Sequence, residues 1–284
     1  MVTDGSPKAS DAGLLMPRIH PAAHVDSEAE LADDVIVGPG AVIERGVRIG
    51  RGCQIGPHAV VHRGTTLNEE VYVSVGAVIG GVPQDLKFKG GASGVEIGPR
   101  TAIREYVTVH RCSTPGAVTR VGAECMLMAT SHVAHDCTLG DRVVLANGAN
   151  LGGHVTIGDA VFVSGHAQIH QFIRVGTLVM IGGGSKVIKD LPPYCVADGH
   201  PARLFGVNVT GLRRAGLGVE EIGQIKEAYR VLFASGVKLQ DALATLDMLG
   251  SDGNSRGAEL AVFVRKSERG IARPNRRGHE RPDD

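Results

Sequence analysis

Four histidines lie close together near the middle of the chain, and their spacing could support general base catalysis. They are His132, His135, His154 and His170, which fall within 39 residues. Imidazole titrates near neutral pH, so a positioned histidine can take a proton from a hydroxyl that is a poor nucleophile by itself. Asp136 follows His135 directly and offers a carboxylate that could orient or polarise the ring. The cluster therefore predicts a site of acid–base chemistry.

A repeat of six residues must position these histidines. Every sixth residue from Ile19 to Val187 is Ile, Leu or Val at 26 of 29 positions, and the residue after it is often Gly. A period of six fits neither an α-helix nor a heptad, but it fits short β segments separated by tight turns. Such units bury their apolar faces only by stacking on one another. The sequence thus predicts an all-β solenoid of parallel strands.

The repeat resembles the hexapeptide-repeat left-handed parallel β-helix, in which three hexads make one triangular coil. The left hand depends on this resemblance, because crossover rules in general favour the right hand. Residues 18 apart would then stack, about 4.8 Å from strand to strand. His135, at an outward turn position, would lie directly under Gly153 and two coils under Gln171, while Asp136 would lie under His154. We expect a base, its partner and a backbone N–H that could face an oxyanion.

Two interruptions break the repeat. The three positions without an aliphatic residue are Asp85, Gly91 and Pro115, and they predict loops at about 82–95 and 111–120. Loops that leave an otherwise regular solenoid are either tolerated insertions or functional arms. Asp85 and Lys87, two apart in the first loop, favour an arm.

The remaining segments have other patterns. The repeat ends at Leu191-Pro192-Pro193, and a helical period begins at Glu220. We therefore expect a polar N-terminal extension at 1–18, a β-helix at 19–192, a helical C-terminal domain at 193–271 and a disordered tail at 272–284.

The composition of the chain excludes several classes of protein. The 284 residues include 30 Lys and Arg and 30 Asp and Glu, a balance that argues against nucleic-acid binding. No apolar run approaches the ~18 residues of a membrane span, and residues 1–18 do not resemble a signal peptide. The five scattered cysteines, without a CxxC pair, fit reduced thiols. These features predict a cytoplasmic protein.

Motifs in and around the loops resemble those of the UDP-N-acetylglucosamine O-acyltransferase family. They are Pro83-Gln84-Asp85-Leu86-Lys87, Val107-Thr108-Val109-His110-Arg111, Ser131-His132-Val133-Ala134-His135-Asp136, Ile169-His170-Gln171-Phe172 and Phe205-Gly206-Val207-Asn208. The resemblance covers roughly residues 19–270. It implies a homotrimeric enzyme that moves a (3R)-3-hydroxyacyl chain from acyl carrier protein to the glucosamine 3-hydroxyl of UDP-N-acetylglucosamine, the first step of lipid A biosynthesis. It implies no metal and no dissociable cofactor.

The same resemblance implies a role for individual residues. His135 would be the general base, Asp136 its orienting partner, and the Gly153 N–H the oxyanion donor. Gly183 would set how deep the acyl chain lies. Asp85 and Lys87 would reach the substrate from a neighbouring subunit. The substrate-binding residues would be Asp85, Lys87, His110, His132, His154, His170, Gln171, Asn208 and Arg214.

Three positions depart from the family pattern, and two other functions remain as alternatives. Thr210 stands where family members have Glu, Ala215 where they have Arg, and His200 where many have Asn. Because all three fall near the expected nucleotide end, a 3-amino acceptor is an alternative. A metal-dependent hydratase on this fold would use His132, His135 and His154 as ligands. A non-catalytic β-helix would have uniform faces without loops.

Overall fold

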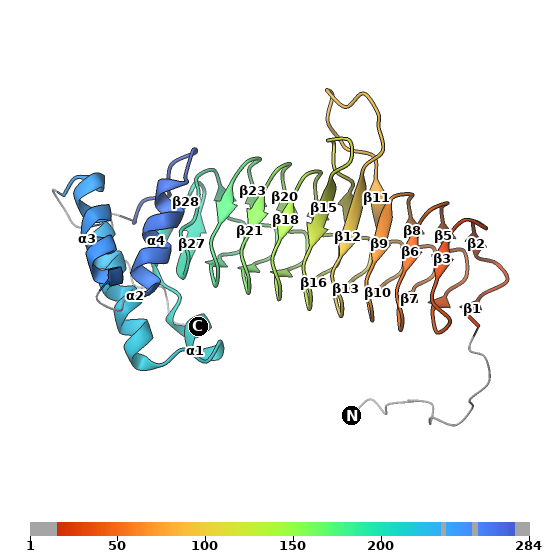
Figure 1. Ribbon diagram of the computed structural model, residues 1–284, viewed down its shortest axis with the longest axis horizontal. Helices are drawn as coiled ribbons and strands as arrows, with labels where there is room; N and C mark the ends of the chain where they lie inside the picture. The colour runs from red at the N-terminus through yellow and green to blue at the C-terminus, as the bar shows by residue number, and fades with distance from the viewer. Residues whose placement is uncertain (1–15, 234–236, 252–254, 276–284) are drawn as a thin grey trace.

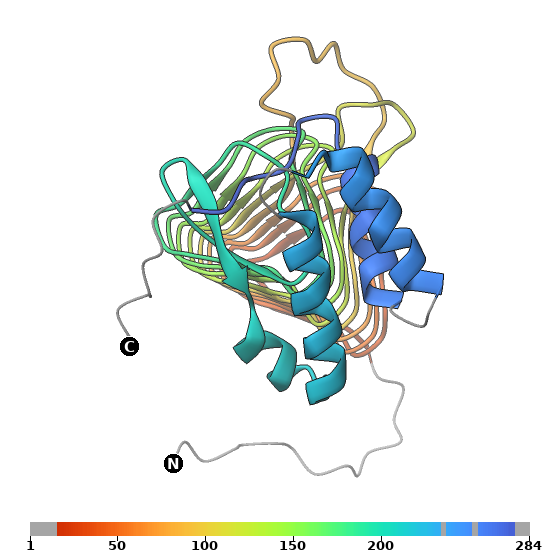
Figure 2. The ribbon, with the colours of Figure 1, turned by 90° about the vertical axis from the view of Figure 1, so that its left-hand side faces the viewer.

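The computed structural model describes residues 16–233, 237–251 and 255–275, and most of this chain winds into a parallel β-helix. Seen along its axis, the coil has a triangular outline (Figure 2). Each side of the triangle is a stack of short strands, so the described residues form three sheets of eleven, nine and eight strands. The expected hexapeptide solenoid with a helical C-terminal part is therefore confirmed.

The strands of each sheet come from successive coils (Figure 1). The eleven-stranded sheet contains β1 (Arg18–Ile19), β4 (Ile36–Val37), β7 (Gln54–Ile55), β10 (Tyr72–Val73), β13 (Ala102–Ile103), β16 (Met126–Leu127), β19 (Val144–Leu145), β22 (Phe162–Val163), β25 (Met180–Ile181), β27 (Cys195–Gly199) and β28 (Ala202–Val207). The nine-stranded sheet contains β2 (His24–Val25), β5 (Val42–Ile43), β8 (Val60–Val61), β11 (Val78–Gly81), β14 (Thr108–His110), β17 (His132–Val133), β20 (Asn150–Leu151), β23 (Gln168–Ile169) and β26 (Lys186–Val187). The eight-stranded sheet contains β3 (Glu30–Leu31), β6 (Arg48–Ile49), β9 (Thr65–Leu67), β12 (Gly94–Ile97), β15 (Val118–Val121), β18 (Thr138–Leu139), β21 (Thr156–Ile157) and β24 (Arg174–Val175).

The sixfold aliphatic series forms the interior of the coil. From Val37 to Val187, each aliphatic member of the series is at most 3% exposed. The second residue of a two-residue strand points inward, and the first points outward. Apolar surface buried in this way stabilises the coil by roughly 25 cal/mol per Å².

The two loops preserve the phase of the repeat. Along most of the coil, strand partners are three hexads apart, as for Met126 and Val144. Tyr72, however, pairs with Ala102, five hexads on, and Ala102 pairs with Met126, four hexads on. The first loop, between β11 and β12, thus adds two hexads, and the second, between β14 and β15, adds one. Both project from the same corner of the coil (Figures 1 and 2), and the aliphatic series resumes in register after each.

The C-terminal part, expected as a helical domain over 193–271, begins instead with a hairpin. Strands β27 and β28 pair antiparallel and extend the eleven-stranded sheet. Buried residues alternate with partly or fully exposed ones through Cys195–Ala197 and Ala202–Phe205, and Gly199-His200-Pro201 makes the turn. Four helices follow: α1 (Val209–Arg214), α2 (Val219–Leu232), α3 (Leu239–Ser251) and α4 (Ser255–Arg265). No helix of the described residues is long and apolar enough to span a membrane.

The helices and the segment after them close the C-terminal end of the coil. The buried Tyr229 hydroxyl of α2 donates to the carbonyl oxygen of Pro193, 2.5 Å away. Residues 272–275, expected to begin a disordered tail, are instead bound to the coil: the Ala272 N–H donates to the Asp190 carbonyl over 2.8 Å and the Asn275 N–H to that of Leu204 over 2.9 Å. Residues 1–15 of the expected extension and 276–284 of the expected tail lie outside the described residues.

We predict that stability depends on the interior series and not on the loop tips. Leu145, fully buried in β19, should cost about 2–5 kcal/mol of unfolding free energy when replaced by Ala, because the cavity cannot collapse in a stacked coil. Leu86 in the first loop is fully exposed, so Leu86→Ala is the matched control and should change stability by less than about 0.5 kcal/mol. Chemical unfolding at one protein concentration measures both. Equal effects would contradict this account of the core.

Candidate active site

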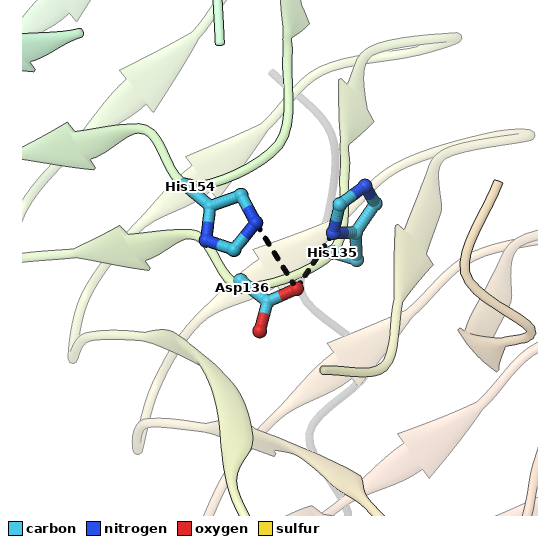
Figure 3. A group of neighbouring side chains, drawn as sticks. All are labelled: His135, Asp136 and His154. Atoms are coloured by element: carbon cyan, nitrogen blue, oxygen red, sulfur yellow. Dashed lines mark hydrogen bonds and ion pairs between the residues drawn. The ribbon is translucent and has the colours of Figure 1, made fainter. Parts of the chain in front are cut away.

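His135 and Asp136 form a hydrogen-bonded pair at one corner of the coil. They lie in the turn between β17 and β18, where Asp136 adopts a left-handed backbone with φ of 61°. The Nδ1 atom of His135 is 2.6 Å from Oδ2 of Asp136 (Figure 3). An ionised carboxylate only accepts, so Nδ1 is the donor in this contact, and the tautomer that fits it has its lone pair on Nε2. That lone pair is what a general base needs.

The next coil places Gly153 and His154 above this pair, as the step of three hexads predicts. A Cβ atom at position 153 would lie 2.6 Å from Cε1 and 2.8 Å from Nε2 of the His135 ring. Glycine is therefore the residue that fits there. His154 Nε2 is 3.8 Å from Asp136 Oδ2, and the rings of His154 and His135 meet edge to face at 5.3 Å (Figure 3).

Asp136 is held as an anion by donors that the sequence analysis did not identify. The Sγ atom of Cys112 is 2.6 Å from Oδ1, and the backbone N of Ser113 is 3.0 Å from Oδ2. Burial alone would raise the pKa of the Asp136 carboxyl, but hydrogen bonds from Cys112, Ser113 and His135 outweigh it and hold that pKa well below its usual range. The only sequence signal is that Cys112 and Ser113 lie near the start of the second loop, expected at about 111–120.

The base itself is buried. His135 was expected at an outward position, but it is only 9% exposed. Its ring lies against Gly153 and His154 of the next coil, while Cys112 and Ser113 of the second loop bond its partner Asp136 at the same corner. The outward position is therefore a sheltered one, since a sixfold pattern gives the direction of a side chain and not what covers it.

His110 and His132 lie next to the pair. His110 ends β14, one coil towards the N-terminus, and His132 begins β17, the strand that precedes His135. Their rings meet edge to face at 4.9 Å, and Thr108 Oγ1 is 2.7 Å from Nδ1 of His132. Burial, and then the neighbouring His132 and His135, lower the pKa of His110 to about 4. Burial, and then His135, also lower the pKa of His132. Both rings are therefore neutral polar groups at pH 7.

His170 and Gln171 lie one coil further on and are exposed. The Gln171 carbonyl accepts a hydrogen bond from Nη2 of Arg269 at 3.2 Å and lies 3.1 Å from Nδ1 of His170. Phe172, beside them, stacks on His154 with ring centroids 4.5 Å apart. This segment thus borders the site through Phe172.

The loop residues Asp85 and Lys87 are not joined to the histidines in a single chain. The Lys87 N–H donates to Oδ1 of Asp85 over 2.9 Å, and the Lys87 side chain is exposed. No hydrogen bond or ion pair connects either residue with His135 or Asp136 within the described residues of this one chain.

Asn208 and Arg214 line a separate pocket at the C-terminal end. The pocket has a volume of about 790 Å³ on the outward face of the eleven-stranded sheet, and Thr210 and Ala215 line it too. Asn208 caps α1 by accepting from the Gly211 N–H, and it donates to the Leu178 carbonyl at 2.8 Å. Two of the three departures from the family pattern therefore lie at this pocket.

Gly183 lies at another corner of the coil and is exposed. A Cβ atom there would be 3.6 Å from the Gly165 carbonyl oxygen, an ordinary contact. A larger side chain would therefore project from this position without displacing the backbone.

A metal ion would find ligands at this corner, but only two of the three that were expected of a hydratase. His135, Asp136 and His154 each offer one ligand atom, all within 4.8 Å of one another. His132, the third expected ligand, is not in this group, and its Nδ1 lies against the Thr108 hydroxyl. The donor set would suit zinc, but Asp136 already bonds Cys112, Ser113 and His135.

Two sequence-family models match the chain. One, described as "Udp N-acetylglucosamine O-acyltransferase; Domain 2", matches residues 190–272. The other, described as "Bacterial transferase hexapeptide (six repeats)", matches residues 119–153.

Curated relatives and solved structures are similar over almost the whole length. A protein of Alkalilimnicola ehrlichii named acyl-[acyl-carrier-protein]--UDP-N-acetylglucosamine O-acyltransferase is 45% identical over 91% of this chain and 100% of its own. A protein of Aliarcobacter butzleri with the same name is 43% identical over 90% of this chain and 98% of its own length. The structure of LpxA from Acinetobacter baumannii matches at a TM-score of 0.86 and 38% identity, over 90% of this chain and 99% of that one. The structure of UDP-N-acetylglucosamine O-acyltransferase from Moraxella catarrhalis matches at a TM-score of 0.86 and 35% identity, over 90% of this chain and 99% of that one. These likenesses confirm the predicted fold, including its left hand.

We predict that His110 makes stability depend on pH between about 4 and 6.5. The unfolded chain binds a proton at His110 near pH 6.5 and the folded chain only near 4, so this contribution is fully present above pH 6.5 and is lost as the pH falls. His110→Gln should flatten the slope of unfolding free energy against pH in this window by up to about 1.4 kcal/mol per pH unit. Denaturant unfolding at a series of pH values measures the slope. The same slope in both proteins would contradict the prediction.

Proposed function

The chain belongs to the UDP-N-acetylglucosamine O-acyltransferase family, so it transfers an acyl chain from acyl carrier protein to UDP-N-acetylglucosamine, and we propose that His135 is the general base of this transfer. The observation that carries the proposal is the buried pair in which Asp136 accepts from Nδ1 of His135, directly beneath Gly153. This pair leaves Nε2 as the free basic atom. We also propose that the transfer takes place in the cytoplasm.

In the proposed reaction, Nε2 of His135 takes the proton of the glucosamine 3-hydroxyl as its oxygen attacks the thioester carbonyl. The new C–O bond forms, an oxyanion develops, and the C–S bond then breaks. The departing thiolate takes the proton back from the imidazolium, which restores the neutral base. Asp136 stabilises the imidazolium between these steps, because its carboxylate is already ionised and 2.6 Å away.

Gly153 supplies the proposed donor to the oxyanion. Among the described residues, its backbone N–H makes no hydrogen bond to another backbone group, whereas its carbonyl accepts from Phe172 at 3.0 Å. A preorganised donor at such a position is worth about 2.7–4 kcal/mol of the activation barrier in acyl-transfer enzymes. Because a side chain would collide with the His135 ring, glycine allows donor and base to sit together.

We propose a homotrimer because two groups of expected substrate ligands lie away from the base. The outward face of the eleven-stranded sheet exposes Tyr72, Met126 and Phe162, by 41, 36 and 40%. The eight-stranded sheet instead carries exposed ion pairs such as Arg48–Glu30. An apolar face of this kind fits contact with another subunit, and a cyclic trimer would join different faces of neighbouring copies. Such packing would bring the first loop, with Lys87, or the C-terminal pocket of one subunit to the turn that carries His135 in the next subunit.

We further propose that the donor carries a (3R)-3-hydroxyacyl chain and that the product enters lipid A. The binding residues would be Asp85, Lys87, His110, His132, His154, His170, Gln171, Asn208 and Arg214. Their support here is their family-like sequence context, together with the position of His110, His132 and His154 around the base. Gly183 would bound the acyl groove, and no metal would take part.

We predict that His135→Ala lowers kcat by about 10²- to 10⁴-fold, since the proton must then pass to water. Because His135 is buried, Tm and oligomeric state are measured on the same samples. His20→Ala removes an exposed histidine near the N-terminal end of the coil and is the matched control, with kcat expected to stay within twofold. Steady-state kinetics with acyl carrier protein thioester are the measurement. A folded His135→Ala enzyme with near-normal kcat would refute the assignment.

We predict that filling position 183 shortens the preferred acyl chain. Glycine leaves space there, and each methylene that can no longer be buried costs about 0.8 kcal/mol. The ratio of kcat/KM for a long to a short hydroxyacyl carrier protein should therefore fall in Gly183→Ala and fall further in Gly183→Met. A ratio that is the same in all three proteins would remove Gly183 from the acyl groove.

A further inference from the structure

We propose that the second loop holds the carboxylate of Asp136 in place, with Cys112 and Ser113 as positioning residues that act through it. The inference deepens the proposed function, because it depends on Asp136 being the partner of the base. Neither residue needs to touch a substrate for this role. The thiol of Cys112 would contribute as a hydrogen-bond donor.

Both oxygens of Asp136 are occupied. Oδ1 is 2.6 Å from the Cys112 sulfur, and Oδ2 is 3.0 Å from the Ser113 nitrogen and 2.6 Å from Nδ1 of His135. The Asp136 N–H donates to Oγ1 of Thr119 at 2.9 Å. The carboxylate therefore cannot rotate without breaking hydrogen bonds, and its Oδ2 stays directed at the ring of the base.

The Cys112 thiol is suited to donate and unsuited to attack. It is 4% exposed, and burial, followed by its hydrogen bond to Asp136, raises its pKa. The sulfur consequently keeps its proton at neutral pH and points it at an anion. A thiolate nucleophile would require the opposite shift.

The backbone around Cys112 is held by hydrogen bonds to both ends of the first loop. The Cys112 N–H donates to the Gly94 carbonyl at 3.2 Å, and the Ser93 hydroxyl donates to the Cys112 carbonyl. The Arg111 N–H donates to the Gly81 carbonyl at 3.0 Å, at the start of that loop. Both ends of the first loop thus brace the start of the second, which in turn braces Asp136.

The proposal is tested by a double-mutant cycle between positions 112 and 136. Cys112→Ala and Cys112→Val, the donor-free variants, lack a donor at position 112 and leave Oδ1 of Asp136 only the more distant Thr114 hydroxyl, at 3.5 Å. Valine fills the space of the thiol, whereas Cys112→Ser keeps a donor. We expect both donor-free variants to lower kcat about tenfold, with KM for UDP-N-acetylglucosamine within twofold, because a hydrogen bond to an ionised group is lost. Cys112→Ser should stay within about threefold of wild-type kcat. In an Asp136→Ala background, the same donor-free changes should alter kcat by less than twofold.

Cys125→Ala is the matched control. Cys125 is 2% exposed, and its sulfur bonds the Gly140 carbonyl at 3.2 Å, so the variant removes a buried thiol that does not contact Asp136. We expect it to lower Tm about as much as Cys112→Ala while keeping wild-type kcat. The inference is overturned if the donor-free variants keep wild-type kcat, if Cys112→Ser is as slow as they are, or if they lose the same factor in both backgrounds. If Asp136→Ala itself keeps wild-type kcat, the role of Asp136 in the proposed function fails instead.

Discussion

The stacking of one coil on the next is the constraint on which the rest of the structure depends. Inward aliphatic side chains at every sixth position fix three short strands per coil, and strand pairing fixes the register between coils. Register then determines what lies above each turn residue. His135 meets the backbone of Gly153, and Asp136 meets His154, only because the two coils are in step. The proposed chemistry is thus a property of neighbouring turns.

Much of this arrangement could be predicted from the sequence because the repeat is both local and periodic. The aliphatic series gives the solenoid, and the step of three hexads places His135 under Gly153 without knowledge of any side-chain rotamer. The two interruptions add whole hexads, so Asp85, Gly91 and Pro115 mark loops without disturbing the register on either side. Periodicity of this kind survives insertions as long as their length is a multiple of six.

Features that depend on irregular backbone could not be predicted in this way. The contacts of Cys112 and Ser113 with Asp136 follow from the path of a loop that has no period. His135 is only 9% exposed, although the repeat placed it on the outside. The β27–β28 hairpin and the docking of residues 272–275 depend on which backbone groups the end of the coil leaves unpaired. Within the described residues, neither Lys87 nor Arg214 makes a hydrogen bond or ion pair with His135 or Asp136, which agrees with our proposal that a neighbouring subunit completes the site.

The identity of the acceptor and the type of bond formed test the central claim, because Thr210 and Ala215, two departures from the family pattern, line the same pocket as Asn208 and Arg214. Purified protein is incubated with a mixture of (3R)-3-hydroxyacyl carrier proteins and, in separate reactions, UDP-N-acetylglucosamine or its 3-amino analogue, and the products are analysed by mass spectrometry before and after mild alkali. Our account predicts a single added hydroxyacyl group that alkali removes, as expected of an ester at the 3-hydroxyl. No acylated sugar nucleotide, or acylation only of a 3-amino analogue with an alkali-stable amide, would contradict it.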